Sequence, residues 1–234
     1  MTESKKIFIV GEEKLVNEWT ALCNSKGFIV EKKINGERGE IQCSSDVWLC
    51  MELSFFEKEQ KRHNVKTIRS QNSSCTILSS SVTITATEQL LWLKNEKNLL
   101  GISGFPTFID APLLELAIPS PVLRENIQRV EDFFINTGKQ FSVIQDRVGM
   151  VMPRILSMLV NESFFALQEE IATPDAIDTA MKLGTNYPFG PIEWGERIGY
   201  DYVVKTLQAI NDEYGEDRYR TAPLLKQFMF TQKL

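Results

Sequence analysis

The sequence predicts an α/β fold, with a shortened doubly wound domain over residues 1–146 and an all-helical domain over residues 147–234. Three observations lead to this prediction. Residues 5–30 alternate strand, helix and strand, which is how a doubly wound sheet begins. A last apolar strand ends just before Gln145. From residue 149 onward, apolar residues recur at helical spacing, and Pro and Gly mark the helix ends.

The elements of the first half follow in order. Lys5–Val10 ends in β-branched and apolar residues, which predicts a buried strand. A helix is expected over Glu12–Ser25, because one face is apolar and Gly27 follows. Further elements are expected at Phe28–Val30 (strand), Val47–Met51 (strand), Phe55–His63 (helix), Val65–Arg69 (strand), Cys75–Leu78 (strand), Pro121–Gly138 (helix) and Phe141–Ile144 (strand).

The second half is expected to contain helices alone. Residues 149–171 place one set of apolar side chains near a common face: Val151, Ile155, Met158, Leu159, Ala166 and Leu167. Thr173 is a helix cap before Pro174, and Gly184 is expected to end that helix. The next helices are expected to start at Pro191, after Gly190, and near Asp201, after Gly199, the last of them running to Tyr214.

Composition excludes several classes of function. A net charge of −5 without a basic cluster argues against a nucleic-acid partner. The sequence shows no apolar run long enough to span a membrane and no signal peptide. The four cysteines (Cys23, Cys43, Cys50 and Cys75) show no metal or redox spacing, so no metal is expected and the chain is expected to be cytoplasmic.

Residues 174–225 carry the most specific motifs. They contain D-A-I-D-T-A-M-K-L-G, then P-F-G-P before an acidic helix, then I-G-Y-D and Y-R-T-A-P-L-L. In this order the motifs resemble the C-terminal domain of the 3-hydroxyacyl-CoA dehydrogenases, which oxidise 3-hydroxyacyl-CoA thioesters with NAD. The resemblance implies a Rossmann-like first half and a homodimer formed through the helical domain. The family's helical hairpin near the CoA site is replaced by N-G-E-R-G-E-I-Q-C-S-S-D, a polar turn-like segment.

The cofactor positions of the resemblance are altered. A dinucleotide-binding turn needs three glycines after the first strand, for the turn, the pyrophosphate and the helix packing. Gly11 falls on the first, but Glu13 and Val16 fall on the second and third, and the ribose-binding acid falls near Ile34. Glu12 and Glu13 are also expected to supply the negative charge that the helix start would otherwise take from an anion. The resemblance implies NAD, but these residues predict that no cofactor binds.

Catalytic positions of the first half are altered as well. The segment Leu99–Pro119 resembles the family's strand with a G-x-H-F-F-N-P core and a following strand with a glutamate. The histidine of that pattern falls on Ser103, its asparagine on Pro106 and its glutamate on Glu115. In the family the histidine is the base, for which its pKa suits it, and the glutamate orients it. The single histidine, His63, lies at a charged helix end and is expected at the surface.

A further catalytic position belongs to the helical half. The family's G-F-x-x-N-R pattern is read here as G-M-V-M-P-R, so Arg154 matches and Pro153 replaces the asparagine that stabilises an oxyanion. Proline is accepted in a first helical turn. Ser79–Ser81 loosely match a strand-to-helix turn of the family. They either line a cleft or are ordinary loop residues, and the second alternative is the expected one for a run of serines.

Three hypotheses about function remain open. The chain is a catalytically inactive relative acting as a dimeric scaffold or regulator, or it binds acyl-CoA or another acyl ligand in the cleft between its two domains. The third hypothesis is an NAD-dependent oxidoreductase acting on 3-hydroxyacyl-CoA in fatty acid metabolism, with relocated catalytic residues. Cofactor binding separates the third hypothesis from the others, and thioester binding separates the second from the first.

Overall fold

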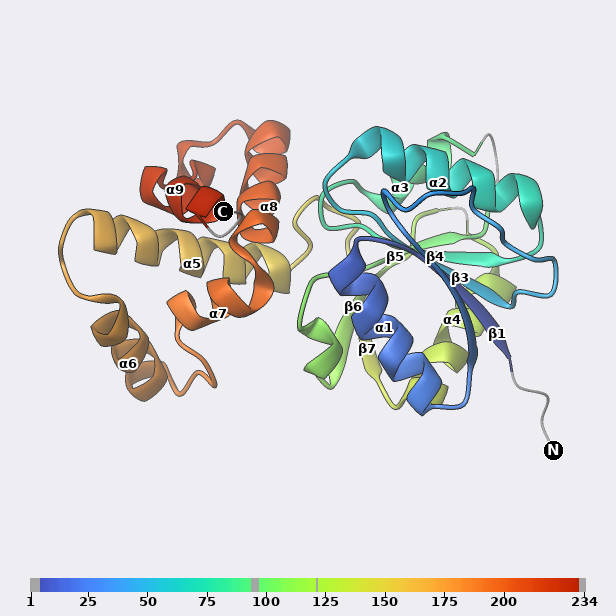
Figure 1. Cartoon of the computed structure of the whole chain (residues 1–234), viewed down its shortest axis with the longest axis horizontal. Coiled ribbons are helices and arrows are strands. Elements are labelled where there is room, and N and C mark those ends of the chain that lie inside the picture. Colours follow the sequence, from blue (N-terminus) through green and yellow to red (C-terminus); the bar gives the residue numbers. More distant parts are fainter. Residues whose placement is uncertain (1–4, 94–96, 121, 232–234) are drawn as a thin grey trace. The chain divides into compact units, whose positions relative to one another are not determined.

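The computed structural model describes residues 5–93, 97–120 and 122–231 (Figure 1). The chain divides into two compact units, Met1–Met150 and Val151–Leu234. The first is a sheet covered by helices, and the described part of the second is helical. The predicted fold class is therefore confirmed. In the described part, no helix combines the length and apolar character that crossing a membrane requires.

The first unit is built on one sheet with the strand order β2-β1-β3-β4-β5-β6-β7. Its strands are β1 (Lys6–Gly11), β2 (Ile29–Ile34), β3 (Leu49–Leu53), β4 (Thr76–Ser80), β5 (Leu99–Ile102), β6 (Leu113–Ala117) and β7 (Gln140–Ile144). Neighbouring strands are parallel except β5 and β6, which are antiparallel. Because the chain leaves β1 for β2 on one side and then returns to β3 on the other, the sheet is doubly wound.

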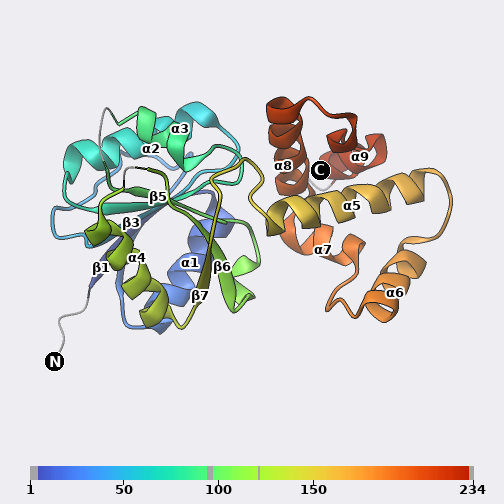
Figure 2. The same ribbon diagram turned by 180° about the vertical axis from the view of Figure 1, so that it is seen from behind.

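Helices cover both faces of this sheet. As Figures 1 and 2 show, α2 (Lys58–Gln71) and α3 (Ala86–Leu91) lie over one face, and α1 (Glu13–Ser25) and α4 (Arg124–Thr137) lie over the other. A short 3₁₀ turn, η1 (Phe108–Asp110), precedes β6. Because both faces are covered, the central strands are continuous buried runs rather than alternating ones. The predicted start of α4, Pro121, lies outside the described residues.

Helix α2 differs from its prediction. The sequence predicts a helix over Phe55–His63 and a strand over Val65–Arg69, but one helix runs through both segments, and the predicted strand is wrong. The buried face of α2 follows helical spacing. It consists of Lys61, Asn64, Val65, Ile68 and Arg69. Because most of these side chains are polar, an apolar pattern does not reveal the face.

The segment between β2 and β3, residues 35–48, contains no helix or strand. This agrees with the predicted loss of a helical crossover. The segment is nevertheless more than a polar turn, because Ile41, Cys43 and Val47 are buried. These side chains join the apolar core between the sheet and α2.

The second unit contains α5 (Met152–Gln168), α6 (Pro174–Thr185), α7 (Pro191–Ile198), α8 (Tyr200–Tyr214), the 3₁₀ turn η2 (Asp217–Tyr219) and α9 (Pro223–Thr231). The hydroxyl of Thr173 accepts a hydrogen bond from the N–H of Ala176, so the predicted cap of α6 is confirmed. That helix ends at Thr185 instead of Gly184, because Asn186 adopts the left-handed conformation (φ 58°) that stops it.

The buried face of α5 is the opposite of the predicted one. The sequence groups Val151, Ile155 and Met158 on one apolar face, but Val151 and Ile155 are 45% and 48% exposed. The face that packs in the helical unit consists of Pro153, Leu156, Ser157, Val160, Asn161, Ser163 and Phe164. Helix α5 therefore carries apolar residues on its outer face as well. A helix with apolar residues all round is expected to be covered on both sides.

Candidate functional site

The carboxyl ends of β1, β2, β3 and β4 form the edge of the sheet where doubly wound proteins bind nucleotides. β1 lies between β2 and β3, so the chain reverses its direction of winding at the end of β1. Two turns meet there, the one from β1 into α1 and the one from β3 into α2. This edge, here called the crevice edge, is the first place to look for a cofactor site.

Gly11 ends β1 at the crevice edge. Its φ of 149° lies in the range that favours glycine. A Cβ atom placed on Gly11 would lie 2.3 Å from the backbone carbon of Leu53 at the end of β3. The glycine therefore allows the two neighbouring strands to approach each other, and the structure uses it for strand packing.

The carboxylate of Glu12 lies on the next turn of the same edge. Its Oε1 atom accepts hydrogen bonds from the backbone N–H groups of Phe55 at 3.1 Å and Phe56 at 3.5 Å. It also accepts one from Nδ2 of Asn35 at 3.3 Å. Glu12 makes no side-chain cap of α1. The expectation that Glu12 supplies the anion at the start of α1 is therefore wrong, because its charge binds the amides between β3 and α2.

The other cofactor positions are placed as follows. Glu13 is the first residue of α1 and is exposed, whereas Val16 is fully buried under that helix. Ile34 ends β2, and its N–H donates to the carboxylate of Glu37 at 3.1 Å. The side chain at the ribose position is thus apolar, and the carboxylate of Glu37 accepts a hydrogen bond from the backbone there.

Polar side chains fill the crevice edge. Nδ2 of Asn35 donates to Oγ of Ser54 at 3.0 Å, and Nδ2 of Asn64 donates to Oγ of Ser54 at 2.9 Å. Asn64 also reaches Oδ1 of Asn35 at 3.1 Å and Oε1 of Glu52 at 3.4 Å. Glu52, Ser54 and Asn64 are fully buried. Asn35, which follows β2, is therefore linked to Ser54 in the turn after β3 by side-chain hydrogen bonds.

A buried ion pair lies at the centre of this network. Nζ of Lys61 on α2 forms a salt bridge with Oε2 of Glu52 on β3, and it donates to Oγ of Ser79 on β4 at 3.2 Å. Ser79 in turn donates to Glu52 at 3.0 Å and contacts Oε1 of Gln89 at 2.6 Å. Burial lowers the pKa of Lys61, and the nearby carboxylate of Glu52 opposes that shift.

Residues Ser79–Ser81 belong to this buried network. The sequence predicts loop residues, but Ser79 and Ser80 end β4, and all three side chains are at most 1% exposed. Nε2 of Gln89 donates to Oγ of Ser81 at 3.3 Å. The prediction of an ordinary loop is therefore wrong. His63, in contrast, lies exposed on α2, as predicted.

These residues do not fit a dinucleotide at the crevice edge. A pyrophosphate needs backbone N–H groups and little negative charge around it. Here the carboxylate of Glu12 already takes the amides of Phe55 and Phe56, and Glu13 adds a second carboxylate at the start of α1. The end of β2 supplies no free acidic side chain at Ile34.

The structure brings Ser103 and Glu115 together. Ser103 follows β5, and Glu115 is the central residue of β6, the antiparallel neighbour of β5. The N–H of Ser103 donates to the carbonyl of Glu115 at 3.1 Å, and Oγ of Ser103 accepts from the N–H of Glu115 at 3.1 Å. Both residues are buried. Ser103, at the position of the family's catalytic base, is thus hydrogen-bonded through its side chain to the backbone of Glu115, at the position of the residue that orients the base.

The segment after β5 is closely packed. A Cβ atom on Gly101 would lie 2.5 Å from Oγ of Ser81, and one on Gly104 would lie 2.8 Å from Cβ of Ser80. Pro106 follows in a buried turn before η1. Little space is left at these positions for a larger side chain.

The remaining catalytic position lies in the helical unit. Pro153 is buried in the first turn of α5 and offers no side-chain donor. The guanidinium of Arg154 donates to the hydroxyl of Tyr219 at 3.0 Å and lies 4.9 Å from the ring centroid of Tyr214. The matching residue Arg154 therefore stabilises contacts inside the helical unit.

The motifs of the helical unit stabilise its fold. Asp178 on α6 accepts hydrogen bonds from the N–H groups of Ile192 at 2.8 Å and Glu193 at 3.0 Å, which are in the first turn of α7. A Cβ atom on Gly190 would lie 2.2 Å from the Asp178 carboxylate. The aspartate of the first motif therefore requires the glycine of the P-F-G-P motif, and both belong to one helix-capping arrangement.

Sequence reasoning did not find the buried network of Glu52, Lys61 and Asn64. The strand pattern V-W-L-C-M ends one residue before Glu52, so the carboxylate was not placed in the strand. The spacing of Lys61, Asn64 and Val65, three and four residues apart, does indicate that they share one helix face. A lysine on a buried helix face indicates a buried ion pair only when its acidic partner has been identified.

Comparison with known proteins gives a family match for the second half. Residues 149–234 match the model of the family described as 3-hydroxyacyl-CoA dehydrogenase, C-terminal domain. The 3-hydroxyadipyl-CoA dehydrogenase of Escherichia coli (strain K12) is 43% identical over 90 residues, which are 38% of this chain and 19% of that protein. The 3-hydroxybutyryl-CoA dehydrogenase of Clostridioides difficile is 26% identical over 190 residues, 81% of this chain and 68% of that protein.

The chain matches only part of the length of several of these relatives. The matched segments span only 19% to 34% of the length of four of the curated relatives. Among solved structures, (S)-3-hydroxybutyryl-CoA dehydrogenase PaaH1 from Ralstonia eutropha is similar with a TM-score of 0.81 at 20% identity, over 98% of this chain and 95% of that chain. At such identity the likeness shows the fold alone.

Proposed function

We propose that this chain is a catalytically inactive member of the 3-hydroxyacyl-CoA dehydrogenase family acting as a homodimeric scaffold. The crevice edge of its Rossmann-like unit is closed by the chain's own polar groups. Its helical unit keeps the motif residues that shape the fold. The protein thus uses the family's architecture without the family's oxidation chemistry.

The position of Glu12 is the observation that supports this proposal most. Its carboxylate accepts hydrogen bonds from the N–H groups of Phe55 and Phe56. A cofactor phosphate brought to the crevice edge meets this negative charge. The repulsion adds to the loss of glycine at Glu13 and Val16. Without NAD, a hydroxyacyl substrate has no hydride acceptor.

The base position supports the same proposal. A serine has no side-chain pKa near neutral pH, so Ser103 cannot take a proton from a hydroxyl group without help from another base. Its hydroxyl oxygen already accepts a hydrogen bond from the backbone N–H of Glu115. Losing a positioned base costs a factor of about 10²–10⁴ in rate. The loss of the asparagine at Pro153 removes a side-chain donor as well.

The outer face of α5 supports the homodimer. Val151, Met152 and Ile155 are 43–48% exposed, and Leu183 on α6 is 83% exposed. An isologous dimer brings the same face of two copies together, so an apolar helix face can cover its own symmetry mate. Burying these side chains is the ordinary driving force of such an interface.

One observation favours an active enzyme as the second candidate. Glu115 keeps the family's acidic residue, and it lies buried beside the base position. An active NAD-dependent oxidoreductase on 3-hydroxyacyl-CoA would need a base from elsewhere in the chain. His63 is exposed on α2 and borders a small surface hollow with Asn35 and Asn64, on the α2 side of the crevice edge.

An assay of acetoacetyl-CoA reduction by NADH tests the proposal. Purified protein is expected to oxidise no NADH above a buffer control across neutral pH. Activity that Glu115→Ala abolishes and Glu13→Gln preserves would contradict the proposal and favour the second candidate. A thermal-shift screen with CoA and acetoacetyl-CoA completes the test, since a ligand of the native state raises the melting temperature. A saturable shift with the thioester alone would replace the scaffold by an acyl-CoA binder.

A further inference from the structure

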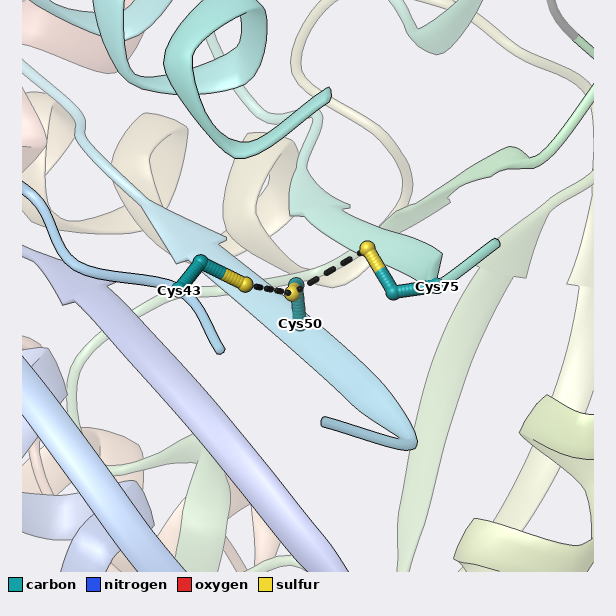
Figure 3. Close-up of side chains that lie close together, drawn as sticks. All are labelled: Cys43, Cys50 and Cys75. Carbon is teal, nitrogen blue, oxygen red and sulfur yellow. Dashed lines mark hydrogen bonds between the residues drawn. The ribbon is translucent and has the colours of Figure 1, made fainter. Parts of the chain in front are cut away.

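Three cysteines meet in the first unit at the end of the sheet opposite the crevice edge (Figure 3). Cys50 is near the start of β3, Cys75 directly precedes β4, and Cys43 lies in the segment before β3. Sγ of Cys50 is 3.4 Å from Sγ of Cys43 and 3.3 Å from Sγ of Cys75. All three sulfur atoms lie within 4.8 Å of one another.

The size of this triangle suits a metal ion. A trigonal centre with metal–sulfur bonds of about 2.3 Å needs sulfur atoms about 4 Å apart. The Cys43–Cys50 and Cys50–Cys75 sulfur separations, 3.4 and 3.3 Å, are shorter than that value, and the third separation is within 4.8 Å. Side-chain shifts of less than about 1 Å, well within one rotamer well, therefore bring the three atoms around one ion.

Two amide side chains at the end of α2 hold the cysteines in place. Oε1 of Gln71 accepts from the N–H of Cys43 at 2.7 Å, and its Nε2 donates to the carbonyl of Ile41 at 2.7 Å. Oδ1 of the neighbouring Asn72 accepts from the N–H of Cys75 at 3.0 Å, and its Nδ2 donates to the carbonyl of Ser44 at 3.0 Å. The loop of Cys43 and the turn of Cys75 are thus fixed to one helix end. Groups that fix ligands in this way strengthen metal binding.

Two arginines lie at the Cys75 end of the cluster. Arg69 is nine-tenths buried and donates from Nη2 to the carbonyl of Cys75 at 3.0 Å. Its Nε atom is a buried donor without a hydrogen-bond partner among the described residues. Arg129 donates to the carbonyl of Ser74 at 3.0 Å.

A surface pocket leads to the cluster. Cys43 forms part of the wall of a cavity of about 720 Å³, together with Gln42, Ser44 and Gln71. Cys50 and Cys75 lie behind Cys43 in the apolar core. Cys43 is therefore the member of the cluster that lies next to the pocket.

We propose that Cys43, Cys50 and Cys75 form a binding site for a three-coordinate thiophilic ion of the Cu(I) class. Thiolate ligands select soft ions such as Cu(I) and Zn²⁺. Structural Zn²⁺ takes four ligands, and the described part of the chain supplies no fourth histidine, cysteine or carboxylate to this group. Three thiolates with Cu(I) carry a charge of −2, which Arg69 and Arg129 balance. With Zn²⁺ the same set would be one ligand short.

The alternative is that the cysteines only fill the core, since a buried free cysteine behaves as a small hydrophobe. Cys23 is such a residue. It is fully buried in α1, and burial alone raises its pKa to about 12. No sulfur partner is recorded for it in the described structure. Cys23 is therefore the matched control for the cluster.

Anaerobic titration with Cu(I), buffered by a chromogenic Cu(I) chelator, tests the proposal on the full chain. We expect one equivalent to be bound by the wild type and by Cys23→Ser, and none to be held against the chelator by Cys50→Ser. Gln71→Ala keeps all ligands and is expected to weaken Cu(I) binding by about 10- to 100-fold. Circular dichroism of each variant checks that it is folded.

X-ray absorption of the wild-type Cu(I) complex gives a readout that does not depend on any variant. Three sulfur neighbours at one distance are expected. Two sulfur neighbours, equal binding by Cys50→Ser, or a stoichiometry that varies with preparation would mean an adventitious ion only and would overturn the site. Preference for Zn²⁺ over Cu(I) in competition would also overturn it, as would a Cys43–Cys50 or Cys50–Cys75 disulfide in protein purified anaerobically under reducing conditions.

Discussion

The hydroxyl of Ser103 accepts a hydrogen bond from the backbone N–H of Glu115, and the N–H of Ser103 donates to the carbonyl of the same residue, both at 3.1 Å. The two positions that form an acid–base pair in the family are thus neighbours here. Their contact, however, extends the pairing of β5 and β6 through a side chain. The hydroxyl oxygen of Ser103 thus accepts a backbone hydrogen bond at the end of the β5–β6 pair.

This contact predicts the cost of removing the hydroxyl. Ser103→Ala leaves the N–H of Glu115 buried without that acceptor, so the free energy of unfolding is expected to fall by about 1–3 kcal/mol. Urea denaturation measures it. Ser142→Ala is the matched control, because Ser142 pairs with Glu115 from β7 but is exposed. Its effect is expected to stay within about 0.5 kcal/mol. Equal effects of the two changes would contradict the structural role of Ser103.

The fold was predictable where local rules and burial agree. The first βαβ unit, the cap at Thr173 and the helix starts at Pro174 and Pro191 follow from strand patterns, caps and prolines, and the structure has them. Helix α2 was not predictable, because Lys61, Asn64 and Arg69 are polar residues on its buried face. The same reason hides the inner face of α5, where Ser157, Asn161 and Ser163 are buried.

The site was predictable only as far as single positions go. The sequence places Gly11 directly after the first strand, and Ser103 and Glu115 in two successive strand segments. In the structure Gly11 ends β1, Ser103 follows β5 and Glu115 is the central residue of β6. What their neighbours do depends on contacts between distant residues. Glu12 binds amides more than forty residues away, and Cys43 meets Cys75 from across another strand. The spacing of residues along the sequence does not predict such contacts between distant residues.

The role of Glu12 leads to a second stability prediction. Glu12→Gln removes the charge that binds the N–H groups of Phe55 and Phe56, and a hydrogen bond to a charged group contributes about 1.5–3 kcal/mol. We expect the free energy of unfolding to drop by about 1–2 kcal/mol, because the amide oxygen still accepts. Glu13→Gln, at an exposed position of the same helix start, should change it by less than about 0.5 kcal/mol. A larger loss of unfolding free energy with Glu13→Gln than with Glu12→Gln would show that Glu12 does not have this structural role.

The buried pair of Lys61 and Glu52 predicts a strong coupling. Lys61→Met leaves Glu52 as an uncompensated buried charge, which typically costs about 3–5 kcal/mol. Adding Glu52→Gln to Lys61→Met should recover much of this loss, since the charge is then gone. A double-mutant cycle measured by urea denaturation gives the coupling. Additive effects of the two changes would show that the pair is not formed.

The same lysine fixes the sign of a pH dependence. Burial lowers the pKa of Lys61 in the folded protein, so between that pKa and the unfolded value of about 10.4 the unfolded chain binds more protons. The free energy of unfolding of the wild type, relative to Lys61→Met, should therefore rise with pH over that alkaline range. Below the folded pKa both states hold the proton, so Lys61 should then add no further pH dependence. A relative stability that declines toward alkaline pH would contradict the burial of a charged Lys61.

The outer face of α5 predicts the state of assembly. Multi-angle light scattering at micromolar concentration should give twice the chain mass of 26.8 kDa. Ile155→Glu places a charge in the proposed interface and should yield monomers. Ile135→Glu is the matched control, because Ile135 is 72% exposed on α4 in the other unit. A wild type of one chain mass across the concentration range would remove the scaffold proposal.

Binding of NADH tests the central claim most directly, because the account holds that the chain's own carboxylate and amides occupy the crevice edge. Isothermal titration calorimetry of the full chain with millimolar NADH, at low and at physiological ionic strength, measures it. The account predicts no saturable heat for the wild type under either condition. A saturable one-to-one isotherm for the wild type would contradict it.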